Sequence, residues 1–348
     1  MSELHKFLFD GLPVRGVIVR LTDAWTEILS RRAAHQPEAD STPAERGGDT
    51  VPASGRWPDP VVELLGEMTA AAALMQANIK FNGALILQIF GDGPVKVAVA
   101  EAQHDMSLRA TAKVVGEVVP QARLPELVNV GNKGRCAITL DPKGRVPGQQ
   151  PYQGVVPLFG DDGEQLDKLS DVLQHYMLQS EQLDTTLVLA ADDKVAAGLL
   201  IQRLPVKGEG NLEGTAGSDL NLANEDEIGR NEDYNRISIL ASTLTREELL
   251  TLDVETILRR LFWEEKLLRF EAKSGLRGPH FACTCSRERV AQMIRGLGVE
   301  EAESILAERA EIEVACDFCG KQYRFDAVDA AQIFRPPGDQ LPPSPTVQ

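Results

Sequence analysis

The segments Phe281-Ala282-Cys283-Thr284-Cys285-Ser286 and Cys316-Asp317-Phe318-Cys319-Gly320 fix the character of the C-terminal part of this chain. A C-x-C pair and a C-x-x-C pair, separated by a helix-like spacer, supply the four thiolates that zinc takes in a tetrahedral structural site. Gly320 favours a tight knuckle, because glycine turns sharply and leaves its amide free for a sulfur. We therefore predict a small zinc domain over residues 279–334, with Cys283, Cys285, Cys316 and Cys319 as ligands.

Other interpretations of these cysteines stay open at this point. One alternative is a static zinc site that only stabilises the fold of the small terminal domain. A thioredoxin-like site needs its C-x-x-C at the start of a helix, whereas Lys321–Phe325 has the pattern of an extended segment. Structural disulfides belong to oxidising compartments, and Met1–Arg20 lacks an export signal. His280 suggests a Cys₃His site, but four cysteines already complete the shell, so we treat His280 as a bystander.

Length and charge limit the class of protein. The 348 residues, 43% of them hydrophobic and 25% charged, suit one sizeable domain plus a smaller one. A net charge of −16 repels a phosphate backbone, so nucleic acid is not an expected partner. No stretch reaches the roughly 18 apolar residues of a membrane span. We expect a cytoplasmic protein that binds neither nucleic acid nor membrane.

Residues 1–205 have the pattern of a mixed α/β domain. Val14–Leu21 and Thr186–Ala190 are predicted strands, and Ala84–Phe90 and Val95–Ala100 form a predicted hairpin around Gly91-Asp92-Gly93-Pro94. Cys136–Leu140 is another predicted strand. Two helices are predicted from apolar residues at helical spacing, namely Val61, Leu64, Leu65, Met68, Ala72 and Met75, and then Leu166, Leu169, Leu173, Tyr176 and Met177. Residues 31–60 have almost no bulky apolar residues and are predicted to form a flexible insertion.

Residues 206–278 combine an acidic loop with helices. Glu209–Asp233 holds eight acidic residues against Arg230. Ile237–Leu244 and Arg246–Leu252 have the pattern of short helices, the second with Thr245 and Glu248 as a capping box. A third amphipathic helix is predicted from Val254, Ile257, Leu258, Leu261, Phe262 and Leu268, and its apolar face needs a partner surface. Residues 335–348 are predicted to be a disordered, proline-rich tail.

No arrangement of residues indicates an enzyme. The glycines at 91–93 and 131–134 match neither nucleotide-binding pattern and are better explained as turns. Cys136 stands alone in an apolar strand, where a cysteine is usually a small buried hydrophobic residue. The five histidines are scattered. We predict an α+β protein without catalytic residues.

Motifs along nearly the whole chain resemble the 33-kilodalton heat-shock proteins, which are redox-regulated, ATP-independent holdase chaperones. The matching motifs are Val14-Arg15-Gly16, Leu64-Leu65-Gly66-Glu67-Met68, Gly91-Asp92-Gly93-Pro94, Tyr152-Gln153-Gly154-Val155-Val156, Gln179-Ser180-Glu181-Gln182-Leu183, Cys283-Thr284-Cys285-Ser286-Arg287-Glu288-Arg289, Ser304-Ile305-Leu306-Ala307-Glu308 and Cys316-Asp317-Phe318-Cys319. The resemblance implies an N-terminal α/β domain, a redox-sensitive helical linker and a C-terminal zinc domain with these four cysteines as ligands. The insertion at 31–60 and the acidic loop at 209–233 depart from the family's pattern.

The resemblance also implies unfolding client proteins as partners, and we count homodimerisation on oxidation among the candidate interactions. Thiolates bound to zinc are the form that oxidants attack, so one site can be stable when reduced and labile when oxidised. We expect local disulfides Cys283–Cys285 and Cys316–Cys319, because each pair closes a short loop. The alternatives are a constitutive zinc-stapled interaction adaptor, which would act equally in both redox states, and a disulfide oxidoreductase, which would turn over a dithiol.

Overall fold

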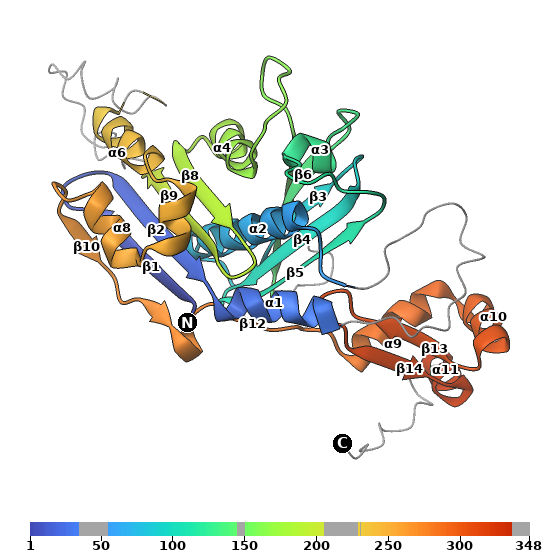
Figure 1. The fold of residues 1–348 in the computed structure, drawn as a ribbon. Coiled ribbons are helices and arrows are strands. Elements are labelled where there is room, and N and C mark those ends of the chain that lie inside the picture. The colour runs from blue at the N-terminus through green and yellow to red at the C-terminus, as the bar shows by residue number, and fades with distance from the viewer. Residues whose placement is uncertain (35–54, 145–149, 205–228, 230, 336–348) are drawn as a thin grey trace, which may run out of the picture. The chain divides into compact units, whose positions relative to one another are not determined.

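The computed structural model describes residues 1–34, 55–144, 150–204, 229 and 231–335 (Figure 1). Contacts divide the chain into two compact units, Met1–Ala282 and Cys283–Gln348. Both units mix helices and strands, which confirms the predicted α+β class. Within the described ranges, no helix has the length and apolar character needed to cross a membrane.

The first sheet of the N-terminal unit has the strand order β10-β1-β2-β9-β8, with β11 paired to β1. The bounds are Leu267–Arg269 (β10), Glu3–Phe9 (β1), Val14–Leu21 (β2), Ala196–Arg203 (β9), Thr185–Ala191 (β8) and Lys273–Ser274 (β11). The predicted strand Val14–Leu21 is confirmed residue for residue, and all of it pairs with β9.

The second sheet has the order β12-β5-β4-β3-β6-β7. The bounds are His280–Phe281 (β12), Ser107–Val114 (β5), Val95–Gln103 (β4), Gly83–Phe90 (β3), Arg135–Pro142 (β6) and Tyr152–Pro157 (β7). The predicted hairpin is confirmed as β3 and β4. Its turn needs glycine, since a Cβ on Gly91 would lie 2.1 Å from the carbonyl oxygen of Val95.

Helix α2, Asp59–Asn78, lies between the two sheets (Figure 1). The sequence correctly predicted this helix, but the prediction that its apolar residues form a single stripe was wrong. The helix is buried on nearly every side, including the run Ala70–Ala73, because sheets flank it on both faces. Small residues permit this close approach: a Cβ on Gly66 would lie 2.3 Å from the Cβ of Ala191 in β8.

The other helices of this unit are α1 (Asp23–Ala34), α3 (Leu124–Val128), α4 (Leu169–Gln179), α6 (Glu232–Ser242), α7 (Arg246–Thr251) and α8 (Val254–Leu261), with a 3₁₀ turn at Gly275–Arg277. We call α6, α7 and α8 the linker helices. Their apolar residues pack on the face of the first sheet opposite α2, in a cluster that includes Phe7, Phe9, Ile18, Leu199, Ile201, Tyr234, Ile237, Leu249, Ile257, Leu258, Leu261 and Phe262. The predicted capping box of Thr245 and Glu248 is present at the start of α7.

Several predicted boundaries were wrong. Residues 31–34 belong to α1 and residues 59–60 to α2 rather than to an insertion. Glu232 and Asp233 form the first turn of α6, where acidic side chains complement the helix dipole. Leu268 is not on the helix that contains Leu261. It lies in β10 and is 44% exposed, because the edge of β1 offers its backbone groups hydrogen bonds.

Other parts of those predictions lie outside the described residues. Residues 35–54 of the predicted insertion, 209–228 and 230 of the acidic loop, and 336–348 of the tail are in this category. Trp57, inside the predicted insertion, is buried and its indole N–H donates to the carbonyl oxygen of Ala112 at 3.2 Å. The part of the insertion that follows Gly55 therefore contributes to the core.

The C-terminal unit contains α9 (Arg287–Leu297), α10 (Val299–Arg309), β13 (Ile312–Ala315), β14 (Gln322–Phe325) and α11 (Ala327–Phe334). Strands β13 and β14 form an antiparallel pair. The core is small: Ile294, Ala302, Ile312, Tyr323, Phe325, Ala330 and Ile333. The predicted extended segment after the last cysteine is confirmed as β14.

Cys136 faces the core between the sheets from β6 and has no exposed surface. Burial raises the pKa of its thiol to about 12, so it stays protonated at neutral pH. We predict that Cys136→Ser lowers the free energy of unfolding by about 1 to 3 kcal/mol, because the serine hydroxyl would be buried among apolar side chains. Urea unfolding followed by the fluorescence of Trp25 and Trp57, which are both buried in this unit, measures the change.

Cys136→Ala is the matched control, because it removes the same sulfur without adding a polar group. It should destabilise less than the serine variant. If serine is tolerated better than alanine, Cys136 is not the packed apolar residue that its surroundings indicate.

Candidate metal centre

The four predicted cysteine ligands lie on two loops of the C-terminal unit. Cys283 and Cys285 precede α9, and Cys316 and Cys319 lie on the turn that joins β13 to β14. Ser286 fixes the first loop, since its side chain accepts a hydrogen bond from the amide of Arg289 and caps α9. The end of the first cysteine pair is thus attached directly to a helix start.

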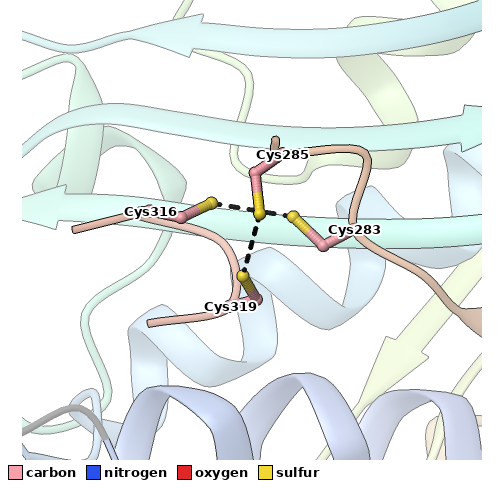
Figure 2. A group of neighbouring side chains, drawn as sticks. All are labelled: Cys283, Cys285, Cys316 and Cys319. Atoms are coloured by element: carbon pink, nitrogen blue, oxygen red, sulfur yellow. Dashed lines mark hydrogen bonds between the residues drawn. The ribbon is translucent and has the colours of Figure 1, made fainter. Parts of the chain in front are cut away.

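The four sulfur atoms converge on one point (Figure 2), and all lie within 4.8 Å of one another. Cys283 Sγ is 3.6 Å from Cys316 Sγ, and Cys285 Sγ is 3.4 Å from Cys319 Sγ. All four side chains are half-buried. The fold therefore brings together two cysteine pairs that are at least 31 positions apart in the sequence. Because the side chains are only half-buried, an oxidant or a metal ion can reach them.

The second loop is a knuckle closed by backbone hydrogen bonds. The Cys316 amide donates to the carbonyl oxygen of Lys321 at 3.0 Å, and the Gly320 amide donates to the carbonyl oxygen of Cys316 at 2.8 Å. Gly320 has φ of 70°, as expected for a tight turn. The prediction that its amide is free for a sulfur was wrong, because that amide closes the turn instead.

Other amides reach the sulfurs. The backbone N–H groups of Phe318 and Cys319 donate to Cys316, and that of Lys321 donates to Cys319. Such hydrogen bonds favour a thiolate over a thiol and orient the sulfur toward the ligand site. The knuckle therefore supplies both the sulfurs and part of the field that stabilises their negative charge.

The pKa values of Cys283, Cys316 and Cys319 are shifted in different directions. The hydrogen bond from Cys316 lowers the pKa of Cys283 to about 4. The same hydrogen bond, followed by burial, raises the pKa of Cys316, and burial raises the pKa of Cys319 to about 11. At neutral pH at least one sulfur of the cluster is a thiolate, which is the form that binds metals and reacts with oxidants.

Tyr323 is a contributor that the sequence did not reveal. Its hydroxyl donates to Cys285 Sγ at 3.1 Å, and Lys321 Nζ lies 5.3 Å from the centre of its ring. The ring itself belongs to the small core. Its place in an alternating strand predicts burial, but the contact between its hydroxyl and a sulfur depends on the folded loop.

This cluster could hold a metal ion. Among the residues that the structure describes, no other set of three or more Cys, His, Asp or Glu side chains brings its ligand atoms so close together. His280 is not in the set: it lies in β12, and its Nδ1 donates to the carbonyl oxygen of Gly278 at 2.9 Å.

Comparisons with known proteins agree with this architecture. The family model described as Hsp33 protein matches residues 48–326. A 33 kDa chaperonin of Chromobacterium violaceum is 41% identical over 333 residues, which are 96% of this chain and 94% of that protein. A 33 kDa chaperonin of Methylobacillus flagellatus is 37% identical, with coverage of 96% and 94%. These relatives carry the name of a chaperone rather than of an enzyme.

A solved structure shares the fold. The crystal structure of the 33 kDa chaperonin of Thermotoga maritima covers 95% of this chain and 97% of its own, with a TM-score of 0.66 at 19% identity. Because the family model matches most of the chain and close relatives align with nearly all of it, this chain belongs to the Hsp33 family.

Proposed function

We propose that this chaperone of the Hsp33 family is an ATP-independent holdase, inactive when reduced and zinc-bound, and activated by oxidation of Cys283, Cys285, Cys316 and Cys319. The observation that carries the proposal is the convergence of four half-buried sulfurs within 4.8 Å in a unit with a small core. We place the protein in the cytoplasm, where thiols remain reduced until stress occurs.

The donor set suits zinc. Four thiol sulfurs without a carboxylate or imidazole match a structural zinc site rather than a calcium or magnesium site, which takes oxygen ligands. Bound zinc would hold the sulfurs as thiolates and supply folding free energy, about 10 to 16 kcal/mol in small zinc peptides. That amount is comparable to the whole stability of a typical domain.

The C-terminal unit has a small hydrophobic core. In its described part, residues 283–335, this core contains seven buried hydrophobic residues, two of them alanines. Met293, Leu297, Val299 and Val328 are all at least 46% exposed. Because a unit of this size buries little apolar surface, we infer that it unfolds when its four sulfurs no longer share a ligand.

Oxidation supplies the trigger. Four thiolates lose four electrons to two molecules of peroxide and form two S–S bonds, and four protons are taken up as four waters are released. A disulfide sulfur no longer carries the negative charge that binds the metal. The same atoms therefore act as ligands and as the sensor.

The linker helices are the second element of the proposed switch. Their apolar face lies on the first sheet, where Leu261 is 3% exposed. Arg20 of β2 donates to the carbonyl oxygens of Leu249, Leu250 and Leu252 at 2.8 to 3.2 Å and so satisfies the C-terminal end of α7. Arg246 attaches the other end of α7 to the carbonyl oxygen of Ala191 at 2.8 Å.

Polar groups are also part of this interface. The hydroxyl of Thr186 in β8 lies 2.9 Å from the Tyr234 hydroxyl and 2.6 Å from the Ser238 hydroxyl of α6. Water can replace such hydrogen bonds when the helix leaves, so their net contribution is modest, about 0.5 to 1.5 kcal/mol each. We infer that α6 can detach at lower cost than a helix held by apolar contacts alone.

Release of the linker helices would expose the apolar face of the first sheet. That face includes Phe7, Phe9, Ile18 and Ile201. A large exposed apolar patch binds the apolar segments of unfolding proteins, or a second copy of itself. We propose this face and the released helices as the surface that holds clients.

The test of the function compares both redox states. Zinc content, free thiols and suppression of aggregation of an unrelated unfolding protein should be measured before and after peroxide. We expect loss of zinc, loss of four thiols and a gain of holdase activity together. Equal activity in both states would instead indicate the constitutive adaptor, and turnover of a dithiol would indicate an oxidoreductase.

We predict one zinc ion per reduced chain. Cys316→Ser should abolish stoichiometric zinc binding, because three sulfurs and a hydroxyl form a much poorer ligand set. Metal analysis after dialysis gives the stoichiometry, and Cys136→Ser is the control that removes a cysteine outside the cluster. Full zinc in the Cys316→Ser variant would show that the ligands lie elsewhere.

We predict that peroxide forms Cys283–Cys285 and Cys316–Cys319. In the folded unit Cys283 Sγ is 3.6 Å from Cys316 Sγ and Cys285 Sγ is 3.4 Å from Cys319 Sγ, so distance there does not favour the local pairs. Once the unit unfolds, loop length decides, and the two local loops are far shorter than any crossed loop. Peptide mapping by mass spectrometry measures the pairing. A majority of crossed bridges would show that the disulfides form in the folded unit, before loop length can decide the pairing.

We predict that Leu261→Glu gives holdase activity without oxidant. A buried carboxylate there would cost at least the roughly 2 to 5 kcal/mol of truncating a buried leucine, so the linker helices would detach. Ile239→Glu is the matched control, because Ile239 lies on α6 but is 67% exposed. Hydrogen exchange across residues 232–262 should rise in the Leu261 variant alone. Rising activity with unchanged exchange would place the client surface elsewhere.

A further inference from the structure

A cavity of about 150 Å³ lies in the N-terminal unit at the C-terminal end of α2. Side chains from both sheets and from α4 form its walls, including Met75, Leu85, Ile138, Leu140, Met177 and Leu200. An apolar cavity of this size holds a molecule about as large as benzene. None of the described residues that line the cavity belongs to the cysteine cluster or to the linker helices.

One buried donor at this cavity lacks a partner. Asn78, the last residue of α2, lines the cavity, and its Nδ2 atom is buried without a hydrogen bond among the described residues. A buried unsatisfied polar group costs about 1 to 3 kcal/mol. A hydrogen-bond acceptor inside the cavity would therefore satisfy the side-chain amide of Asn78.

A cation stands beside this donor. Arg15 also lines the cavity, and its guanidinium donates only to neutral acceptors, the Gln202 side chain and the carbonyl oxygen of Asn78 at 3.2 Å. Within the described ranges no carboxylate forms an ion pair with Arg15. An unpaired, half-buried guanidinium next to an apolar cavity favours an anionic ligand.

Two more cations strengthen the positive field. Lys6 donates to the carbonyl oxygen of Ala77, and burial, followed by the charges of Lys273 and Arg15, lowers the pKa of Lys6. The C-terminal end of a helix carries only about half a negative charge. The partial negative charge at the end of α2 is therefore too small to neutralise Lys6, Arg15 and Lys273. This local positive charge contrasts with the net charge of the chain, which is −16.

An acidic residue also lines the cavity. The Glu181 carboxylate accepts hydrogen bonds from the hydroxyl of Tyr176 at 2.7 Å and from that of Tyr152 at 3.3 Å. Both hydroxyls donate to Oε1 of Glu181, and this carboxylate forms no ion pair with Arg15 among the described residues, so the amide of Asn78 and the guanidinium of Arg15 remain for a ligand.

We propose that this cavity binds a small carboxylate with a short apolar chain, with the carboxylate at Asn78 and Arg15 and the chain between the two sheets. A ligand held there would touch α2 and both sheets at once. It would stabilise the N-terminal unit without involving the cysteines.

Hexanoate is the probe, and methionine methyl groups are the reporters. Of the six methionines, Met75 and Met177 line the cavity, whereas Met293 lies in the C-terminal unit. In full-length, reduced, zinc-loaded protein labelled with ¹³C at the methionine methyl groups, hexanoate should shift the signals of Met75 and Met177 saturably and leave that of Met293 unchanged. Hexanol, which has the same chain without the charge, should bind at least tenfold more weakly.

Two variants test the two halves of the site. Asn78→Asp should weaken hexanoate at least tenfold, because it replaces the donor by a negative charge that pairs with Arg15. Asn82→Asp is the matched control, since it makes the same change of charge at an exposed position outside the cavity. Leu140→Trp should abolish binding by filling the space, and its thermal unfolding shows whether the unit still folds.

The outcomes separate clearly. Saturable shifts that Asn78→Asp weakens and Asn82→Asp does not would support the carboxylate site. Equal affinity for hexanoate and hexanol would overturn the role of Arg15 and Asn78, and unmoved Met75 and Met177 signals at millimolar hexanoate would overturn the cavity as a ligand site.

Discussion

The structure depends on a single constraint: both faces of the first sheet are apolar and both must be covered. Strand β9 at its middle is buried at all eight positions, Ala196–Arg203, which is possible only when something packs on each face. Helix α2 covers one face and the linker helices cover the other. The two covers differ in how they are held. Helix α2 has a sheet on each side, whereas the linker helices have a sheet on one side and charged side chains on the other.

In the proposed function, this difference would allow one fold to contain a permanent core and a layer of helices that can detach. Removing α2 would separate the two sheets and destroy the N-terminal unit. Removing the linker helices would uncover one sheet face and leave the core between the sheets intact. Arginine contacts to backbone carbonyls hold α7 in place, and they depend on geometry that a displaced helix loses at once. The proposed exposure of a client surface would rely on this arrangement.

The C-terminal unit follows a different rule. Its core is small, and in the proposed function the four sulfur atoms would supply the remaining stability through a shared metal ion, which would make that stability dependent on the redox state. The knuckle amides and the Tyr323 hydroxyl surround the sulfurs with donors, which favours thiolates. Stability and sensitivity to oxidants therefore have the same cause. The cavity beside α2 borders the core between the two sheets, so a ligand there would act on a part of the N-terminal unit that the proposed switch leaves folded.

The sequence by itself determined the features whose causes are local. The spacing of Cys283, Cys285, Cys316 and Cys319 predicted the cluster, Gly91 and Gly93 predicted the hairpin, and Thr245 with Glu248 predicted a helix start, because each depends on residues within a few positions or on the number of ligands. Only the tertiary structure decided that α2 is buried on nearly every side, that Leu268 lies at the edge of β1 rather than on the helix, and that the Tyr323 hydroxyl donates to Cys285. These features depend on which surface lies opposite a residue, and periodicity along a chain shows that a face is apolar without showing what will cover it.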